Sequence, residues 1–226
     1  MARTGKVAVM LAGCGHLDGA EIREAVLTLL ALDQHGVEAQ CIAPNDWQAP
    51  VVDHAAGQPA GGERRNILVE SSRIARAGKC LDLARAKAED YDALLLPGGF
   101  GAAKNLCTFA FKGTDAEVRP DVAAFIGAFF AAKKPIGAIC ISPALVALCL
   151  AKAGKSATLT LGDGKDIQAA MEKLGQTYQP VPSAREIVVD EALKLVTTSA
   201  YMFDDARLSD VWVGIERCVG EVLRRA

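Results

Sequence analysis

The sequence lacks the features of a membrane-spanning or a nucleic-acid-binding protein. Its longest uninterrupted apolar run, Val122–Ala132, is far short of the ~20 residues that a membrane-spanning helix needs. It has no excess of positive charge either, because 25 Lys and Arg residues face 27 Asp and Glu residues and the net charge is -2. We therefore expect no membrane and no nucleic acid as a partner.

Metal-binding and disulfide patterns are also missing. No two of the seven cysteines are spaced as C-x-x-C, and the three histidines all lie within the first quarter of the chain, so we expect no metal site. An odd number of scattered cysteines favours reduced thiols and a cytoplasmic protein. The apolar run before Cys14 has about six residues, fewer than the ~7–15 of a signal peptide, which argues against export.

The chain does have the composition and the alternation of an α/β protein. With 226 residues, of which 51% are hydrophobic, it is expected to form a single domain over residues 1–226. Short apolar runs alternate with amphipathic segments, which predicts a mainly parallel sheet covered by helices on both faces. The predicted strands are Val7–Leu11, Val37–Ala43, Ala93–Leu96, Pro135–Ile139, Ile187–Val189 and Leu195–Thr198, and the predicted helices are 22–36, Asp121–Lys133, Pro143–Lys152 and Asp204–Arg224. The polar segment at about 44–79 is less regular and is interpreted as an insertion or lid.

Glycine-rich turns follow two of the predicted strands but do not complete a nucleotide-binding motif. The third glycine of G-x-G-x-x-G is replaced by Asp18 in the first turn and by Lys104 in the second. Gly154-Lys155-Ser156 ends a helix and lacks the first glycine of a P-loop. We therefore expect no nucleotide cofactor.

Cys140 is the candidate nucleophile. It stands where the strand Pro135–Ile139 gives way to a helix for which Ser142 is the expected N-cap, and Ala138 and Ser142 are the small flanking residues that a strained strand-turn-helix elbow needs. A thiol at a helix N-terminus gains from the helix amides, which favour the thiolate and lower its pKa. The alternative is that Cys140 is one more buried small apolar residue.

Two further segments lie beside predicted strand ends. Glu21, in Asp18-Gly-Ala-Glu21, is either a catalytic carboxylate or the third helical residue of a capping box whose N-cap is Asp18. The glycine-rich stretch Pro97–Asn105 either presents main-chain N–H groups to an oxyanion or makes a tight connection between a strand and a helix. The residues alone leave both alternatives open.

Taken together, these segments resemble the DJ-1/PfpI superfamily, and within it the glyoxalase-like branch associated with enhancing lycopene, or isoprenoid, biosynthesis. The matching segments are Leu11–Thr28, Arg65–Asn66, Glu70–Arg76, Pro97–Asn105, Ile139–Pro143 and Val196–Met202. The resemblance implies a flavodoxin-like three-layer sandwich with the class I glutamine-amidotransferase-like fold. It also implies Cys140 as nucleophile, Glu21 as its acidic partner, and an oxyanion site made by the amides of Gly99 and Ile141.

Departures from the wider superfamily narrow the expected activity. Residue 141 is Ile, whereas the protease-like branch has His directly after the nucleophile, and no histidine follows His54 to complete a glutaminase Cys-His pair. What remains is a Cys-Glu pair, which suits a small aldehyde. The resemblance therefore implies a glutathione-independent glyoxalase, a hydro-lyase of low activity that converts glyoxal to glycolate and methylglyoxal to lactate with no cofactor and no metal.

Two expectations about partners complete the sequence-based interpretation. The partners are a small aldehyde substrate and, in a homodimer, a second copy of the chain. The alternative function is a non-catalytic redox-sensing or partner-binding protein that acts through an oxidisable Cys140.

Overall fold

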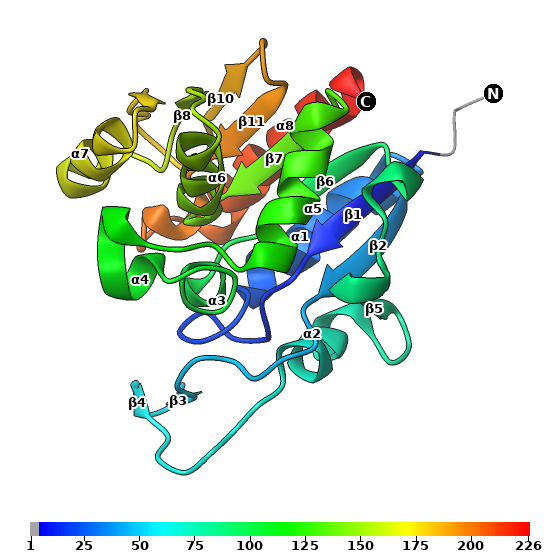
Figure 1. Ribbon diagram of the computed structural model, residues 1–226, viewed down its shortest axis with the longest axis vertical. Helices are drawn as coiled ribbons and strands as arrows, with labels where there is room; N and C mark the ends of the chain where they lie inside the picture. Colours follow the sequence, from blue (N-terminus) through cyan, green and yellow to red (C-terminus); the bar gives the residue numbers. More distant parts are fainter. Residues whose placement is uncertain (1–4) are drawn as a thin grey trace.

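The computed structural model of the chain describes residues 5–226, which form a twisted seven-stranded sheet with helices on both sides (Figure 1). The strand order is β10-β11-β7-β6-β1-β2-β5, and every neighbouring pair is parallel except β10 and β11. The strands of this sheet are β1 (Lys6–Met10), β2 (Glu38–Ala43), β5 (Cys80–Asp82), β6 (Ala93–Leu96), β7 (Ile136–Ile139), β10 (Ile187–Asp190) and β11 (Leu195–Thr198). The predicted α/β fold with a mainly parallel sheet is confirmed.

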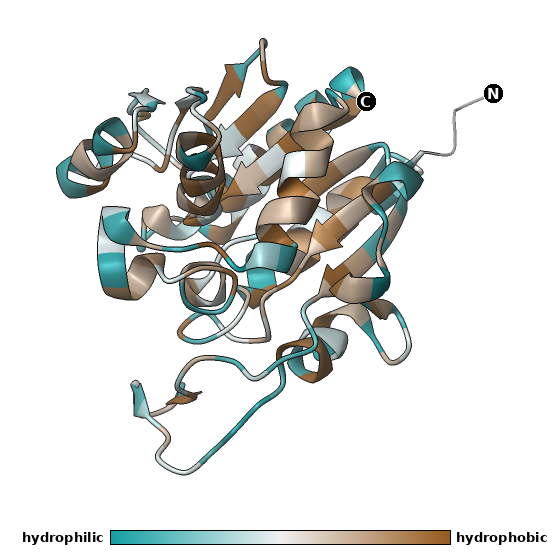
Figure 2. Ribbon diagram, in the orientation of Figure 1, coloured by the Kyte–Doolittle hydropathy of each residue, from teal (hydrophilic) through white to brown (hydrophobic). Residues whose placement is uncertain are grey.

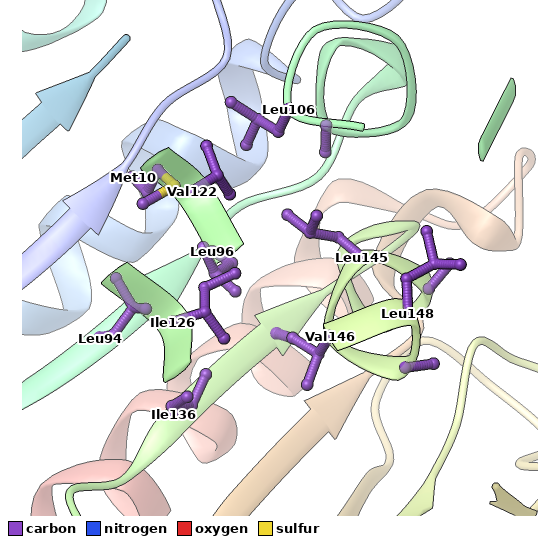
Figure 3. Close-up of a cluster of buried hydrophobic side chains, with 14 of the residues drawn as sticks. Met10, Leu94, Leu96, Leu106, Val122, Ile126, Ile136, Leu145, Val146 and Leu148 are labelled. Atoms are coloured by element: carbon purple, nitrogen blue, oxygen red, sulfur yellow. The ribbon is translucent and has the colours of Figure 1, made fainter. Parts of the chain in front are cut away.

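Two buried apolar layers hold helices against the sheet. Helices α5 (Pro120–Ala131) and α6 (Ser142–Lys152) share one buried cluster, which Figure 3 shows in close-up, with Leu94, Ile126 and Val146 among its members. Helices α1 (Ile22–Gln34) and α8 (Leu208–Arg225) share the cluster on the opposite face. The strands between these layers are apolar at nearly every position, as the hydropathy colours show (Figure 2), because both of their faces are covered.

The apolar residues of α1 fall at Ile22, Ala25, Val26, Leu29 and Leu30, which predicts that these positions face the sheet, but only Ala25 among them is buried. Ile22 and Val26 are 45% and 48% exposed, and the buried positions belong instead to Glu24, Ala25, Thr28, Ala31 and Leu32. Small side chains let the helix approach the sheet closely. Glu24 can occupy the first buried position because its carboxyl group finds hydrogen-bond donors there.

The segment interpreted as an insertion contains a small hairpin and a helix. Strands β3 (Val52–Asp53) and β4 (Gln58–Pro59) pair with each other and lie apart from the main sheet in Figure 1. Helix α2 (Ile67–Ala75), capped by the Asn66 side chain, packs on β2 and β5. A lid function for residues 44–79 stays a prediction.

The remaining short elements connect the main ones. They are the 3₁₀ turns η1 (Leu83–Arg85), η2 (Ala88–Asp90), η3 (Gly113–Asp115) and η4 (Ala200–Met202), the helices α3 (Phe100–Lys104), α4 (Phe109–Lys112) and α7 (Lys165–Lys173), and the paired strands β8 (Thr158–Leu159) and β9 (Thr177–Tyr178). Over residues 5–226, no helix is long and apolar enough to cross a membrane.

Candidate functional site

Cys140 lies at a sharp turn between β7 and α6. Its φ is +61°, a left-handed conformation that is unfavourable for a residue with a Cβ atom. The main-chain N–H of Cys140 still donates to the carbonyl of Thr198 on β11, so the sheet pairing continues up to the turn. The side chain is 7% exposed. The expected strand-turn-helix elbow is therefore present.

The helix after the elbow begins differently from the prediction. Ser142 is the first residue of α6 and Ile141 is its N-cap, so the prediction that Ser142 caps this helix is wrong. The Ser142 hydroxyl instead donates to the carbonyl of Pro97 at 2.8 Å, which joins the elbow to the turn after β6.

The carboxyl group beside Cys140 belongs to Glu24. It is fully buried on the first turn of α1 and lies against the Cys140 thiol, with which it interacts electrostatically. Its Oε2 accepts the main-chain N–H of Gly98 at 2.9 Å, and its Oε1 accepts that of Tyr201 at 3.2 Å. Three segments far apart in the sequence thus fix one side chain against the sulfur.

The expectation that Glu21 lies against the sulfur is therefore wrong. Glu21 is the N-cap of α1, and its Oε2 accepts the main-chain N–H of Glu24 at 2.6 Å. Because the helix begins three residues later than a cap at Asp18 would place it, Asp18 is outside the helix and its Oδ2 accepts the N–H of Val52. Glu24 takes the place expected for Glu21, one helical turn further on.

A signal for Glu24 is present in the sequence. Glu24 is spaced four residues before Thr28 and eight before Leu32, which places these three residues on one helical face. The larger apolar residues Ile22, Val26 and Leu30 lie on the exposed side of α1, and their spacing led to the wrong prediction of the buried face.

The main-chain N–H groups of Gly99 and Ile141 both lie beside the Cys140 sulfur and favour its thiolate form. The structure thus brings together the two amides expected to form an oxyanion site, and that role stays a prediction. Gly98 and Gly99 make this approach feasible. A Cβ on Gly98 would lie 2.4 Å from the Cβ of Cys140, and one on Gly99, whose φ is +90°, would lie 2.3 Å from the main-chain nitrogen of Glu21.

Burial is the largest influence on the pKa values of Glu24 and Cys140. Burial and, after it, the negative charge of Glu21 raise the pKa of Glu24 to about 8, although the Cys140 thiol and the main-chain N–H groups of Tyr201 and Gly98 act to lower it. Burial also raises the pKa of Cys140 well above its ordinary value, as does a charged Glu24. The amides of Gly99 and Ile141 favour the thiolate, but the expected net lowering of the Cys140 pKa is wrong because burial outweighs them.

The three histidines have partners elsewhere. His54 accepts the N–H of Leu17 through Nε2, and its ring contacts that of His16 edge-on at 5.4 Å between centroids. His35 lies 3.9 Å from Glu216. Within residues 5–226, no group of three or more His, Cys, Asp or Glu side chains is arranged to hold a metal ion.

Known proteins are similar to this one in sequence, in fold or in both over nearly the whole chain. A human protein named glutamine amidotransferase-like class 1 domain-containing protein 3, mitochondrial, is 42% identical, and the match covers 96% of this chain and 82% of the relative. The crystal structure of an isoprenoid biosynthesis protein with an amidotransferase-like domain from Ehrlichia chaffeensis is 40% identical, with a TM-score of 0.89 over 97% of this chain and 98% of that one. A glyoxalase III from Candida albicans, 15% identical, shares the fold with a TM-score of 0.61 over 98% of this chain and 97% of its own.

These relatives contradict the expected cytoplasmic location. The human protein and the ES1 proteins of Rattus norvegicus and Danio rerio are all named mitochondrial. The cysteine argument failed because reduced thiols distinguish reducing from oxidising compartments, and several compartments of a cell are reducing.

The part of the chain that matches a known family includes the residues of the site. The model of the DJ-1/PfpI family matches residues 16–207, a range that contains Glu21, Glu24, Gly99, Cys140 and Ile141. Six of the seven strands of the main sheet, the elbow at Cys140 and the buried carboxyl beside it lie within this match, and β1 precedes it. The chain therefore belongs to the DJ-1/PfpI family.

Proposed function

We propose that this protein is a cofactor-independent glyoxalase that converts small 2-oxoaldehydes to 2-hydroxy acids, with Cys140 as nucleophile and Glu24 as proton shuttle. The observation that carries the proposal is the placement of a fully buried carboxyl group, that of Glu24, against the Cys140 thiol, with the main-chain N–H groups of Gly99 and Ile141 beside the same sulfur. The 40% identical relative named for isoprenoid biosynthesis supports a role in the same metabolic setting.

An aldehyde fits this pair better than an amide does. Attack on an aldehyde releases no amine, so no histidine is needed to protonate a leaving group. A thiol that is only 7% exposed also favours a small substrate such as glyoxal or methylglyoxal. The pKa of Glu24, raised to about 8, keeps its carboxyl protonated at neutral pH and able to give and take a proton near that pH.

The addition step starts from the form in which the sulfur and Glu24 share one proton. The Cys140 thiolate bonds to the aldehyde carbon, and the carbonyl oxygen takes the proton from Glu24, which gives a neutral hemithioacetal. The amides of Gly99 and Ile141 stabilise the negative charge that develops on the oxygen.

The isomerisation and release steps then need no external oxidant. The Glu24 carboxylate takes the proton from the carbon bound to sulfur and returns it to the neighbouring carbon, while the hydroxyl proton passes from the first oxygen to the second. One carbon is oxidised to a thioester as its neighbour is reduced to an alcohol. The hydroxyl group of a water molecule then bonds to the thioester carbon and the carbon–sulfur bond breaks. The remaining proton of that water restores the one-proton Cys140–Glu24 pair as the 2-hydroxy acid leaves.

The test is conversion of glyoxal to glycolate by purified variants. Cys140→Ser should abolish turnover, because a serine hydroxyl without a base stays protonated. Glu24→Gln should lower turnover by about 10²–10⁴-fold, the usual contribution of a general acid–base group. Cys14→Ser is the matched control, because Cys14 also follows a strand in a glycine turn, and it should keep wild-type activity.

The number of turnovers separates catalysis from sensing. A catalyst consumes many equivalents of 2-oxoaldehyde, whereas a redox sensor that is merely modified at Cys140 stops at about one. Wild-type turnover in the Glu24→Gln variant would remove the shuttle role, and activity in the Cys140→Ser variant would overturn the glyoxalase proposal.

A further inference from the structure

Glu21 has no role in the proposed reaction, yet it is bound to the residue that has one. Its Oε2 accepts the main-chain N–H of Glu24 at 2.6 Å, and its own N–H donates to the carbonyl of Gly98 at 3.0 Å. Gly98 is also the residue whose N–H binds the Glu24 carboxyl group. Glu21 and Glu24 are thus held by the same turn after β6, and their positions are linked.

The groups that act on Glu24 come from four segments of the chain. On α1 the group is Glu21, whose own charge acts on Arg23, and the guanidinium of Arg23 donates to the phenol oxygen of Tyr201 at 3.1 Å. The elbow after β7 contributes the Cys140 thiol, and η4 contributes Tyr201 through its main-chain N–H. The turn after β6 contributes only the amide of Gly98. Glu21 is the carboxylate among these groups, and it is half-buried, so solvent screens its charge only in part.

We infer that Glu21 is a positioning residue, which fixes the first turn of α1 and, through its negative charge, governs the protonation of the Glu24 carboxyl beside Cys140. The part of this inference that concerns catalysis rests on the proposed function. The geometric link between the two carboxyl groups stands without it.

The sign of the effect follows from repulsion between like charges. A negative charge at Glu21 opposes ionisation of Glu24, which raises the pKa of Glu24. Removing that charge should let the Glu24–Cys140 pair lose its first proton at lower pH. The reactivity of Cys140, which needs that loss, should then begin at lower pH as well.

The experiment is a titration of the Glu24 carboxyl group in protein labelled with ¹³C in its glutamate side chains, with the signal assigned from the Glu24→Gln variant. Glu21→Gln keeps the shape and a cap oxygen but removes the charge, so the midpoint should fall by about one pH unit. Glu21→Asn and Glu21→Asp form a second pair, because both are good N-caps and they differ in charge alone. The Asn variant should shift the midpoint and the Asp variant should restore it.

Asp33→Asn makes a like change of charge near the other end of α1, where the side chain is exposed, and should leave the midpoint in place. A purely structural role for Glu21 predicts unfolding or lost turnover with no shift. An unchanged midpoint in folded Glu21→Gln and Glu21→Asn proteins, or equal shifts in the Asn and Asp variants, would overturn the inference. The readout does not use turnover, so absence of glyoxalase activity with a shifted midpoint would count against the proposed function alone.

Discussion

Glu24 is a carboxyl group with no exposed surface, and such a group is costly to ionise inside a protein. Two main-chain N–H groups donate to its oxygens and the Cys140 thiol lies beside them, but no cation within residues 5–226 is bonded to it. The least costly response to burial is to keep the proton, which is what a pKa raised to about 8 means. The residue thus combines a stability cost at high pH with a chemical use near neutral pH.

This cost predicts how stability depends on pH. The pKa of Glu24 is about 8 in the folded protein against 4.5 for an unperturbed glutamate, so its stabilising contribution is complete below about pH 4.5 and is lost as the pH rises to about 8. Between those limits the wild type should lose up to about 4 kcal/mol of unfolding free energy relative to Glu24→Gln, whose side chain does not titrate. Urea unfolding at a series of pH values measures the difference.

The matched control is Glu172→Gln, the same chemical change at an exposed position on α7. Its unfolding free energy should follow that of the wild type at every pH. A difference between wild type and Glu24→Gln that stays constant from pH 4.5 to pH 8 would mean that Glu24 does not titrate in this range.

Two of the five non-glycine residues with positive φ in residues 5–226 lie beside this carboxyl group or directly precede a residue that bonds to it. Cys140 and Ala200 have φ values of +61° and +42°, although neither is glycine. One carries the thiol that lies against Glu24, and the other directly precedes Tyr201, whose N–H donates to Glu24. Strained residues of this kind cost about 1–3 kcal/mol each and persist where surrounding structure imposes them. Here both conformations serve to place a group against Glu24.

At the level of helices, two glycines illustrate how packing overrides propensity. Gly214 of α8 lies against the segment before β10, and a Cβ there would be 2.0 Å from the carbonyl oxygen of Ala184. Gly127 of α5 is exposed, and a Cβ there would meet nothing within 4 Å. Both are helix-interior glycines, so the same substitution isolates the effect of packing.

We expect Gly214→Ala to lower the unfolding free energy by about 1–3 kcal/mol, because the helix must move away from Ala184. Gly127→Ala should raise it by about 0.5–1 kcal/mol, because alanine restricts the unfolded chain and favours the helix. Urea unfolding of the two variants checks both signs. Equal effects at the two positions would show that α8 does not pack as described.

The elements that the sequence predicts well are those with a strong apolar pattern. The strand Ala93–Leu96 has the observed bounds, and Leu195–Thr198 does too. The sequence predicts less well where a helix begins and which of its faces is buried. The last helix begins at Leu208 and not at Asp204, and in α1 a buried glutamate and small residues occupy the face that the larger apolar residues were expected to fill.

Helices α2 and α7 were not predicted at all. Glu70 and Ser71 are buried positions of α2 and interrupt its apolar pattern, and α7 buries only Met171. The spacing of Glu24 with Thr28 and Leu32 places it on one helical face, but its position against Cys140 also depends on where Gly98 and Tyr201 place their N–H groups. The elbow at Cys140 was predictable because its strand, turn and helix are adjacent in the sequence.

At the scale of the whole molecule, the predicted homodimer stays a prediction. The buried side chain of Asn105 is one of the contacts that join the segment at 44–79 to the region of the site. Asn105, at the end of α3, donates through Nδ2 to the carbonyls of Ala12 and Asp18, at 2.8 Å and 2.7 Å. Its Oδ1 accepts the N–H of Ala49, within the inserted segment, at 2.7 Å. One amide group therefore joins the turn after β1, the helix after β6 and the insertion.

This arrangement predicts that Asn105→Asp destabilises the protein strongly. A carboxylate cannot donate to the carbonyls of Ala12 and Asp18, so two buried acceptors would lose their partner and face a negative charge at 6% exposure. We expect a loss of about 2–4 kcal/mol in urea unfolding and faster proteolysis within the exposed residues 53–64. The control is Asn45→Asp, because the exposed Asn45 uses only its Oδ1, as acceptor from Asn66, and a carboxylate keeps that bond. If both variants unfolded at the wild-type urea concentration, the hydrogen bonds of Asn105 would not stabilise the junction between residues 44–79 and the turn after β1.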